Sequence, residues 1–169
     1  QIGYCEKGRY ANKIIIPTYN VDGQLDYFVA RSFEKEPSRK YDAPPSDKNI
    51  IGFENMINWN IPIVLCEGAF DAIAIKRNAI PLFGKNISKK LMQKLVTSEV
   101  KKVYLALDKD AIKSTYKIAE QLLDAGKKIF VINLDDKDPA DMGFALFTNK
   151  IQQSQEFTFS SLFNLKLSI

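Results

Sequence analysis

The feature that most constrains the fold is a series of four short apolar runs, separated by segments with helical spacing. The runs are Ile63–Cys66, Ile80–Phe83, Val103–Leu107 and Ile129–Leu134. They lack the alternation of polar and apolar residues that a half-exposed strand shows, so each is predicted to be a strand buried on both faces. Strands of this kind separated by helices indicate a mostly parallel sheet flanked by helices. The predicted fold class is therefore α/β.

The segments between these runs carry the signals of helices. Ala69–Asn78 has helical spacing, and Ser88 can cap a second helix in which apolar residues recur at i and i+4. A third helix is predicted from Ala111 to Ala125, and it ends at Gly126, a residue type favoured just beyond helix ends. This alternation predicts one α/β domain over residues 61–150.

The preceding residues 1–60 have a different pattern and are predicted to form a small N-terminal β-rich lobe. Residues 13–33 fit a hairpin in which KIIIPTY and LDYFVARSF are strands, joined by a turn at Asn20–Gly23. An exposed polar loop over residues 34–48 and a short helical piece over residues 53–59 then lead to the α/β domain.

The two ends of the chain carry weaker signals. Residues 151–169 are assigned to a C-terminal extension, whose apolar part from Glu156 to Ile169 is interpreted as a strand. Because the sequence begins with Gln1 rather than methionine, we expect it to be a fragment of a longer protein. No apolar run approaches the roughly 20 residues of a membrane span and no signal peptide is visible, so we expect a cytoplasmic location.

Composition limits the chemistry that the chain can perform. It contains no histidine, and its only cysteines are Cys5 and Cys66. Imidazole bases and zinc sites with histidine ligands are therefore excluded, and two cysteines are too few for a four-cysteine zinc site. Any metal site must be built mainly from carboxylates, whose oxygens favour Mg²⁺ or Mn²⁺. The net charge of +4 permits an anionic partner without requiring one.

Acidic residues follow three of the four apolar runs. These residues are Glu67 after the first run, Asp108 and Asp110 after the third, and Asp135, Asp136, Asp138 and Asp141 after the fourth. In an open parallel sheet the carboxyl ends of the strands form the ligand-binding edge, so these residues should converge. Asp108 and Asp110 are two positions apart and should point the same way, so that both can bind one metal ion. Solvation of loop ends explains a single acidic residue, but explains this convergence poorly.

Two further acidic residues have a structural explanation beside the metal-binding one. Asp71 falls in the first turn of a predicted helix, where the helix dipole favours a carboxylate. Asp138 precedes Pro139, and this pair is typical of an N-cap followed by proline at the first helical position. Both interpretations stay open for each residue.

At this point the residues carry a family resemblance, which covers roughly residues 9–145. The segments VLCEGAFDAIAI, LFGK, YLALDKD and DDKDPAD resemble the successive motifs of the Toprim domain. The form Glu67-Gly68-Ala69-Phe70-Asp71 is similar to the Glu-Gly-x-x-Asp of bacterial (DnaG-type) and phage primases. In the N-terminal half, IIIPTYNVDGQLDYFVAR followed by RKYDAPP resembles the smaller lobe of the primase RNA-polymerase domain.

The resemblance implies the catalytic core of a DNA primase, a metal-dependent nucleotidyltransferase that makes RNA on a single-stranded DNA template. It implies that Glu67, Asp108 and Asp110 are catalytic and bind Mg²⁺ or Mn²⁺, as two ions, with Asp71 and Asp138 as further ligands. The implied partners are single-stranded DNA, ribonucleoside triphosphates, a replicative helicase and a zinc-binding domain outside this segment. The implied location is the cytoplasm or nucleoid of a bacterial or phage-infected cell.

Basic residues are the implied contacts to nucleotides and template. Arg31, Lys40 and Tyr41 match the lobe of the family, and basic side chains supply the phosphate contacts that dominate nucleic-acid affinity. Arg39 and Lys13 lie in the same lobe. Lys85 departs from the family pattern, since it stands after Gly84 where threonine is expected, and it can approach a phosphate. For each residue, a solvated surface charge is the alternative. Further departures are Lys109 within Asp-x-Asp and the wider spacing of Asp138 and Asp141.

Other functions stay open beside the primase. A Toprim nuclease would use the same acids and metal to activate water. A topoisomerase-related fragment would need a nucleophilic tyrosine, and none of the seven tyrosines stands in a recognisable nucleophile context. A non-catalytic nucleic-acid-binding module would use the acids for a structural cation. The basic lobe with Arg31 and Lys40-Tyr41 favours the primase.

Overall fold

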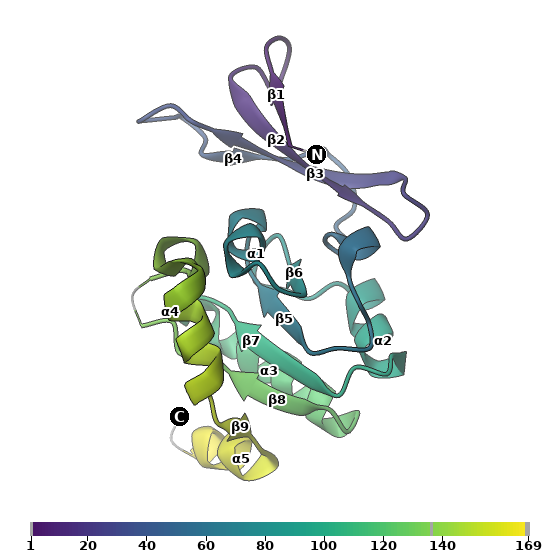
Figure 1. The fold of residues 1–169 in the computed structure, drawn as a ribbon, viewed down its shortest axis with the longest axis vertical. Coiled ribbons are helices and arrows are strands. Elements are labelled where there is room, and N and C mark those ends of the chain that lie inside the picture. The colour runs from purple at the N-terminus through teal and green to yellow at the C-terminus, as the bar shows by residue number, and fades with distance from the viewer. Residues whose placement is uncertain (1, 136, 168–169) are drawn as a thin grey trace.

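The computed structural model describes residues 2–135 and 137–167, which form a small antiparallel sheet above a larger α/β unit (Figure 1). Gln1, Asp136, Ser168 and Ile169 lie outside the described residues. The fold class that the sequence predicts is confirmed, with a mostly parallel sheet, flanking helices and a β-rich lobe. Among the described residues, no helix is long and apolar enough to cross a membrane.

The lobe is a four-stranded antiparallel sheet with strand order β1-β2-β3-β4. The strands are β1 (Gly3–Cys5), β2 (Lys13–Tyr19), β3 (Leu25–Ser32) and β4 (Tyr41–Asp42). The predicted hairpin is β2 and β3, and its turn is closed by the side chain of Asn20, whose Oδ1 accepts hydrogen bonds from the backbone N–H groups of Asp22 and Gln24. Gly23 adopts a φ of 75°, a conformation that glycine allows without strain.

The α/β unit is a five-stranded sheet with strand order β6-β5-β7-β8-β9. The strands are β5 (Ile63–Cys66), β6 (Ala79–Pro81), β7 (Lys102–Ala106), β8 (Lys128–Val131) and β9 (Glu156–Phe157). The first four pair in parallel, and β9 pairs antiparallel to β8. Each of the four apolar runs therefore overlaps a strand, and every residue of β5 is buried.

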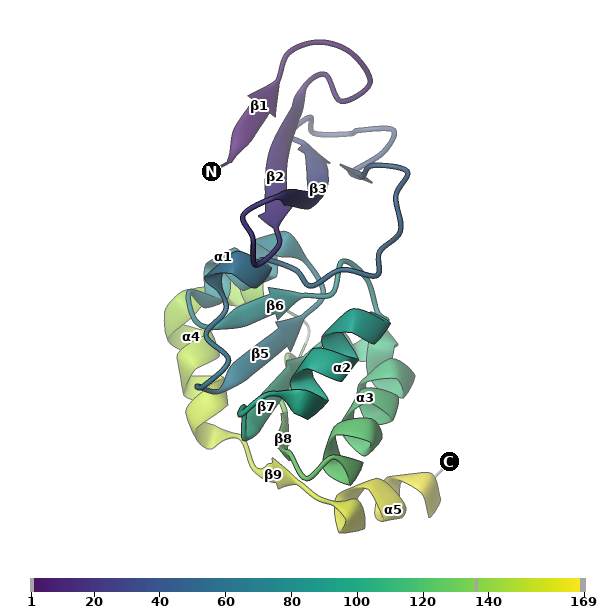
Figure 2. The ribbon, with the colours of Figure 1, turned by 90° about the vertical axis from the view of Figure 1, so that its right-hand side faces the viewer.

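Helices cover both faces of this sheet, as Figure 2 shows. They are α1 (Ala69–Ile75), α2 (Lys89–Thr97), α3 (Ile112–Asp124) and α4 (Pro139–Gln153). Along β5, Ile63 and Leu65 join the apolar cluster under α2 and α3, whereas Val64 and Cys66 join the cluster under α1 and α4. The alternation of side chains along a strand thus fills two cores at once. Ser88 caps α2 as predicted, since its Oγ accepts a hydrogen bond from the backbone N–H of Leu91.

Two predicted elements differ from the structure. The C-terminal segment is a strand only at Glu156–Phe157, and Phe159–Leu167 forms the helix α5. Apolar residues at Phe159, Leu162 and Phe163 have the i, i+3, i+4 spacing of a helix, which outweighs the β propensity of single residues. The helical piece before the α/β unit is shorter than predicted, because only Glu54–Met56 forms a 3₁₀ turn, η1. The boundaries at residues 60 and 150 stay a prediction.

The lobe rests on the α/β unit through buried polar and aromatic contacts. The Oγ1 atom of Thr18 in β2 accepts a hydrogen bond of 2.9 Å from the backbone N–H of Phe53. The ring of Phe83, in the loop after β6, lies 5.2 Å from the ring of Tyr27 and 6.3 Å from that of Phe53. Because Thr18 and Tyr27 are almost fully buried, these contacts fix the lobe against the sheet.

Gly52 is the point of closest approach in this junction, and its replacement tests the junction. A Cβ atom there would lie 2.4 Å from the carbonyl oxygen of Pro81. We expect Gly52→Ala to lower the free energy of unfolding by about 1–3 kcal/mol, the usual cost of overpacking, as measured by urea denaturation. Gly3→Ala is the control, because nothing lies within 4 Å of its added methyl group. Equal stabilities for the two variants would contradict the packing described here.

Candidate metal and nucleic-acid site

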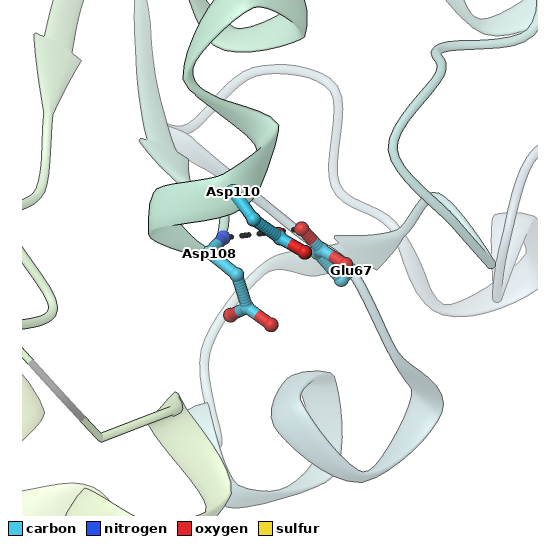
Figure 3. Close-up of side chains that lie close together, drawn as sticks. All are labelled: Glu67, Asp108 and Asp110. Atoms are coloured by element: carbon cyan, nitrogen blue, oxygen red, sulfur yellow. Dashed lines mark hydrogen bonds between the residues drawn. The ribbon is translucent and has the colours of Figure 1, made fainter.

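Three carboxylates converge at the carboxyl ends of the neighbouring strands β5 and β7. Glu67 directly follows β5, Asp108 lies two residues beyond the end of β7, and Asp110 lies in the 3₁₀ turn η2 (Lys109–Ala111). One oxygen atom from each carboxylate lies within 4.8 Å of the others. Figure 3 shows the carboxylates of Glu67 and Asp110 directed toward one another, and the backbone N–H of Asp108 donating to Oε1 of Glu67 at 3.1 Å. We call these three residues the acidic triad.

The reason for the convergence differs in part from the sequence argument. Asp108 is extended, but Asp110 sits in η2, where the backbone N–H of Ala111 donates to the carbonyl oxygen of Asp108 at 2.9 Å. A turn rather than the alternation of a strand therefore brings Asp110 back toward Glu67. The sequence argument placed the residues together correctly but gave the wrong local geometry for Asp110.

The electrostatics of the acidic triad favour a cation. Burial, and then the neighbouring Asp108, raise the pKa of Glu67 above its ordinary value. Burial, and then Asp138 and Asp110, raise the pKa of Asp108. Both shifts mean that ionised carboxylates at this place repel each other and lack solvent. A hard divalent cation with oxygen ligands would relieve this repulsion, so the residues present fit Mg²⁺ or Mn²⁺.

Asp71 and Asp138 have the local roles that the sequence suggested as alternatives. Oδ2 of Asp71 accepts a hydrogen bond of 2.9 Å from the backbone N–H of Gly68 at the start of α1. Oδ1 of Asp138 caps α4, accepting a hydrogen bond of 2.7 Å from the backbone N–H of Asp141. Burial, followed by the charge of Asp138 among the raising causes, brings the pKa of Asp71 to about 6. Both residues also line the cleft described next, so metal contacts for them stay a prediction.

The other acidic residues of the late cluster are not brought to the triad. Asp135 forms an ion pair with Lys150 of α4, with 2.5 Å between Oδ2 and Nζ. Asp141 is exposed, and its backbone N–H is the group that Asp138 caps. Asp136 lies outside the described residues.

A cleft of about 810 Å³ lies between the carboxyl edge of the sheet and the lobe. Its acidic lining residues are Glu67, Asp71, Asp108 and Asp138 at the edge of the sheet, and Asp42 in β4 of the lobe. Its basic lining residues, all from the lobe and the loop after it, are Arg9, Arg31, Arg39, Lys40 and Lys48. Opposite charges therefore face each other across one cavity, which suits a ligand that combines metal-bound phosphates with a polyanionic chain.

Arg31 connects the two sides of the cleft. Its guanidinium group lies 4.9 Å from the ring centroid of Tyr41 in β4 and 4.7 Å from that of Phe70 in α1. It also donates a hydrogen bond from Nη1 to the hydroxyl of Tyr41. The side chain that the sequence assigned to phosphate contact is thus also packed between two rings. Tyr41 keeps 45% of its surface exposed, and Nζ of Lys40 lies 6.0 Å from its ring centroid.

The remaining basic residues of the lobe differ in availability. Asp42 in β4 forms ion pairs with Lys13 at 3.2 Å, Arg9 at 3.8 Å and Arg39 at 3.9 Å. Lys13 is mostly buried in this arrangement and does not line the cleft, whereas Arg39 and Lys40 are exposed. Sequence reasoning missed Arg9 as a cleft residue, because nothing except its charge distinguished it. It missed Lys48 for the same reason.

Lys85 lies at the acidic triad itself. Its Nζ atom is 2.5 Å from Oδ2 of Asp110. The sequence assigned this lysine to nucleotide binding, and that role stays a prediction. The structure places its charge beside a carboxylate of the triad.

Comparison with known proteins agrees with this geometry. Residues 64–142 match the family described as Toprim-like. The chain is 34% identical over 132 residues to an uncharacterized protein of Mycoplasma pneumoniae, the MG010 homolog, covering 70% of the chain and 61% of that protein. It is 31% identical over 117 residues to MG010 of Mycoplasma genitalium, covering 64% of the chain and 52% of that protein. It is 25% identical over 120 residues to the DNA primase of Enterobacteria phage T4, covering 69% and 33%.

Solved structures share the fold. The Escherichia coli primase catalytic core has a TM-score of 0.74 at 17% identity, covering 98% of this chain and 60% of that one. The DnaG primase catalytic domain bound to single-stranded DNA gives 0.72 at 18% identity, covering 98% and 59%. The zinc-binding and RNA-polymerase domains of the Aquifex aeolicus primase give 0.71 at 21% identity, covering 89% and 42%.

The chain matches only part of each of these relatives. The chain spans 61% and 52% of the two Mycoplasma proteins, so the activity of a whole protein does not follow from them. The Toprim-like match includes all three residues of the acidic triad. Residues 64–142 therefore match the Toprim-like family, and the chain has the fold of the catalytic core of DnaG-type DNA primases.

Proposed function

We propose that this chain is the catalytic core of a DNA primase, which joins ribonucleotides into short primers on a single-stranded DNA template. The observation that carries the proposal is the cleft in which Glu67 and Asp108 of the acidic triad face basic residues of the lobe. Nucleotidyl transfer needs both, because a triphosphate must be neutralised beside a template strand that is held by cations. The fold shared with primase catalytic cores supports the same conclusion.

The acidic triad would hold the metal. Glu67 and Asp108 offer oxygens from two neighbouring strand ends, and Asp110 offers a third from η2. A bound Mg²⁺ or Mn²⁺ would neutralise phosphate oxygens and stabilise the charge that develops in an in-line displacement at phosphorus. Within the chain, the hydrogen bond from Asp108 N–H to Glu67 fixes the glutamate side chain before any ligand arrives.

The template would be held by the basic side of the cleft, because the acidic edge repels a DNA backbone. Arg39 and Lys40 are exposed cations of this surface, and the partly exposed ring of Tyr41 can stack on a base. Arg31 would set the distance between lobe and α1 as well as contact phosphate, since it packs on Tyr41 and Phe70.

Further partners follow from the same proposal. Some primases of this fold carry a zinc-binding domain, as the Aquifex aeolicus structure does. We expect a zinc-binding domain and a replicative helicase to act with this core in the cytoplasm or nucleoid.

A metal-dependent nuclease is the second candidate, because the same acidic triad can activate water instead of a 3′-hydroxyl group. The basic residues of the lobe that line the cleft favour the primase, because they can hold a template strand. The assay that follows separates the two, since a nuclease shortens the template and incorporates no nucleotide.

Primer synthesis tests the proposed function. We expect the full-length protein to incorporate labelled ribonucleotides on single-stranded DNA only with Mg²⁺ or Mn²⁺, and Glu67→Gln to reduce this incorporation at least a hundredfold, since an interaction with developing charge is lost. Glu99→Gln, at an exposed glutamate before β7 and outside the cleft, is the matched control. Incorporation by Glu67→Gln at the wild-type rate, with both variants folded, would rule out the assigned role.

Binding of single-stranded DNA tests the basic surface. We expect Lys40→Ala and Arg31→Ala to weaken binding at every template sequence and to flatten its salt dependence, since each phosphate contact contributes about 0.7 to the slope. Lys40→Ala is the cleaner variant, because Lys40 is exposed while Arg31 packs between rings. Lys113→Ala on α3 removes an exposed charge outside the cleft and should bind like wild type. Unchanged affinity in both cleft variants would place the template elsewhere.

A further inference from the structure

The loop between β6 and α2 holds a lysine beside the acidic triad. Lys85 lies in this loop, and its Nζ atom is 2.5 Å from Oδ2 of Asp110. Asp110 belongs to the triad, whose three oxygens lie within 4.8 Å of one another. The ammonium group therefore lies directly against one carboxylate of the triad.

The backbone of this loop is held from both sides, so the position of Lys85 is built into the fold. On the sheet side, the backbone N–H groups of Leu82 and Gly84 donate to the carbonyl oxygens of Cys66 and Glu67, at 2.8 and 3.3 Å. Gly84 has a φ of 142°, which side-chain-bearing residues rarely adopt.

On the other side, the ring of Phe83 packs against Tyr27 of the lobe and Phe53 of the connecting segment, and Nζ of Lys48 donates to the carbonyl oxygen of Phe83 at 3.0 Å. The residue immediately before Gly84 is thus anchored to the lobe. The stem of Lys85 starts from a fixed point beside the strand end that carries Glu67.

The position of Lys85 affects how many divalent cations the acidic triad can hold, because the charges must balance. Three ionised carboxylates attract cations, and one divalent ion together with one ammonium group supplies a matching charge. A divalent ion on Asp110 would need its oxygen at about 2.0–2.6 Å, in the space that the lysine nitrogen now approaches. The lysine and a second ion would also repel each other at this distance.

We propose that Lys85 takes the place of one of two divalent cations at the acidic triad, so that this chain binds a single divalent ion there. The ion is held mainly by Glu67 and Asp108, and the ammonium group of Lys85 supplies the second positive charge at Asp110. About half of the Lys85 side chain is exposed, so its ammonium group can also contact a phosphate that approaches the triad. This inference rests on the metal role proposed above for the acidic triad.

The number of Mn²⁺ ions bound per chain tests the proposal without any measurement of activity. Mn²⁺ alone is titrated into the full-length protein, and the free ion is counted by its electron paramagnetic resonance signal. We expect one triad ion in the wild type and two in Lys85→Ala. We expect Lys85→Arg, which keeps the charge, to bind one. Lys89→Ala removes an exposed lysine at the start of α2 that does not contact the triad, and it should also bind one.

The background of weak surface sites is removed by repeating each titration in Glu67→Gln. One ion in both the wild type and Lys85→Ala, or two in both, would overturn the role of Lys85 while leaving the metal site in place. No ion in any variant would overturn this inference together with the metal role of the triad. Two ions in Lys89→Ala as well would show an effect of net charge alone and would equally contradict the proposal.

Discussion

The parallel pairing of β5 with β7 is the interaction on which the rest of the site depends. In this pairing Cys66 lies opposite Ala106, so both strands end at the same edge of the sheet. Glu67 and Asp108 are the polar residues just beyond those ends, and one hydrogen bond joins them. Strands buried on both faces are stable in this position because apolar residues fill two cores, and their ends then hold repelling carboxylates side by side. The stability of the sheet thus offsets an arrangement that is unfavourable in itself.

The lobe adds basic residues beside the acidic edge of the sheet. It is fixed to the α/β unit by buried contacts of Thr18 and Tyr27, and it carries basic residues that line the same cleft as Glu67 and Asp108. The loop that contains Phe83 serves both purposes, since its aromatic ring contacts the lobe and its next residues approach Glu67 and Asp110. A change in how the lobe packs against the α/β unit would therefore alter the acidic triad through this loop.

Strands that depend on the local residue pattern were predicted correctly from the sequence. Side-chain positions that depend on tertiary contacts were not. The strand Ile63–Cys66 was predictable because its unbroken apolar run is too short for a helix and is followed by Gly68 and a segment with helical spacing. Asp110 was placed correctly for an incorrect reason, since a 3₁₀ turn rather than strand alternation directs its side chain. The packing of Arg31 on Phe70 joins residues that are distant in sequence, so no periodicity indicates it. The helix α5 was predicted wrongly as a strand, because the apolar and aromatic residues of the segment were weighed by their β propensity rather than by their helical spacing.

Anomalous diffraction from Mn²⁺-soaked crystals is the most direct measurement of the central claim, that the carboxyl edge of this sheet is a metal site facing a nucleic-acid cleft. We predict an anomalous peak within about 2.0–2.6 Å of carboxylate oxygens of Glu67 and Asp108, the distance range of hard divalent cations. A peak at this place, on the side open to the cleft, would support the account. Peaks only at other carboxylates, with none at the acidic triad, would contradict it.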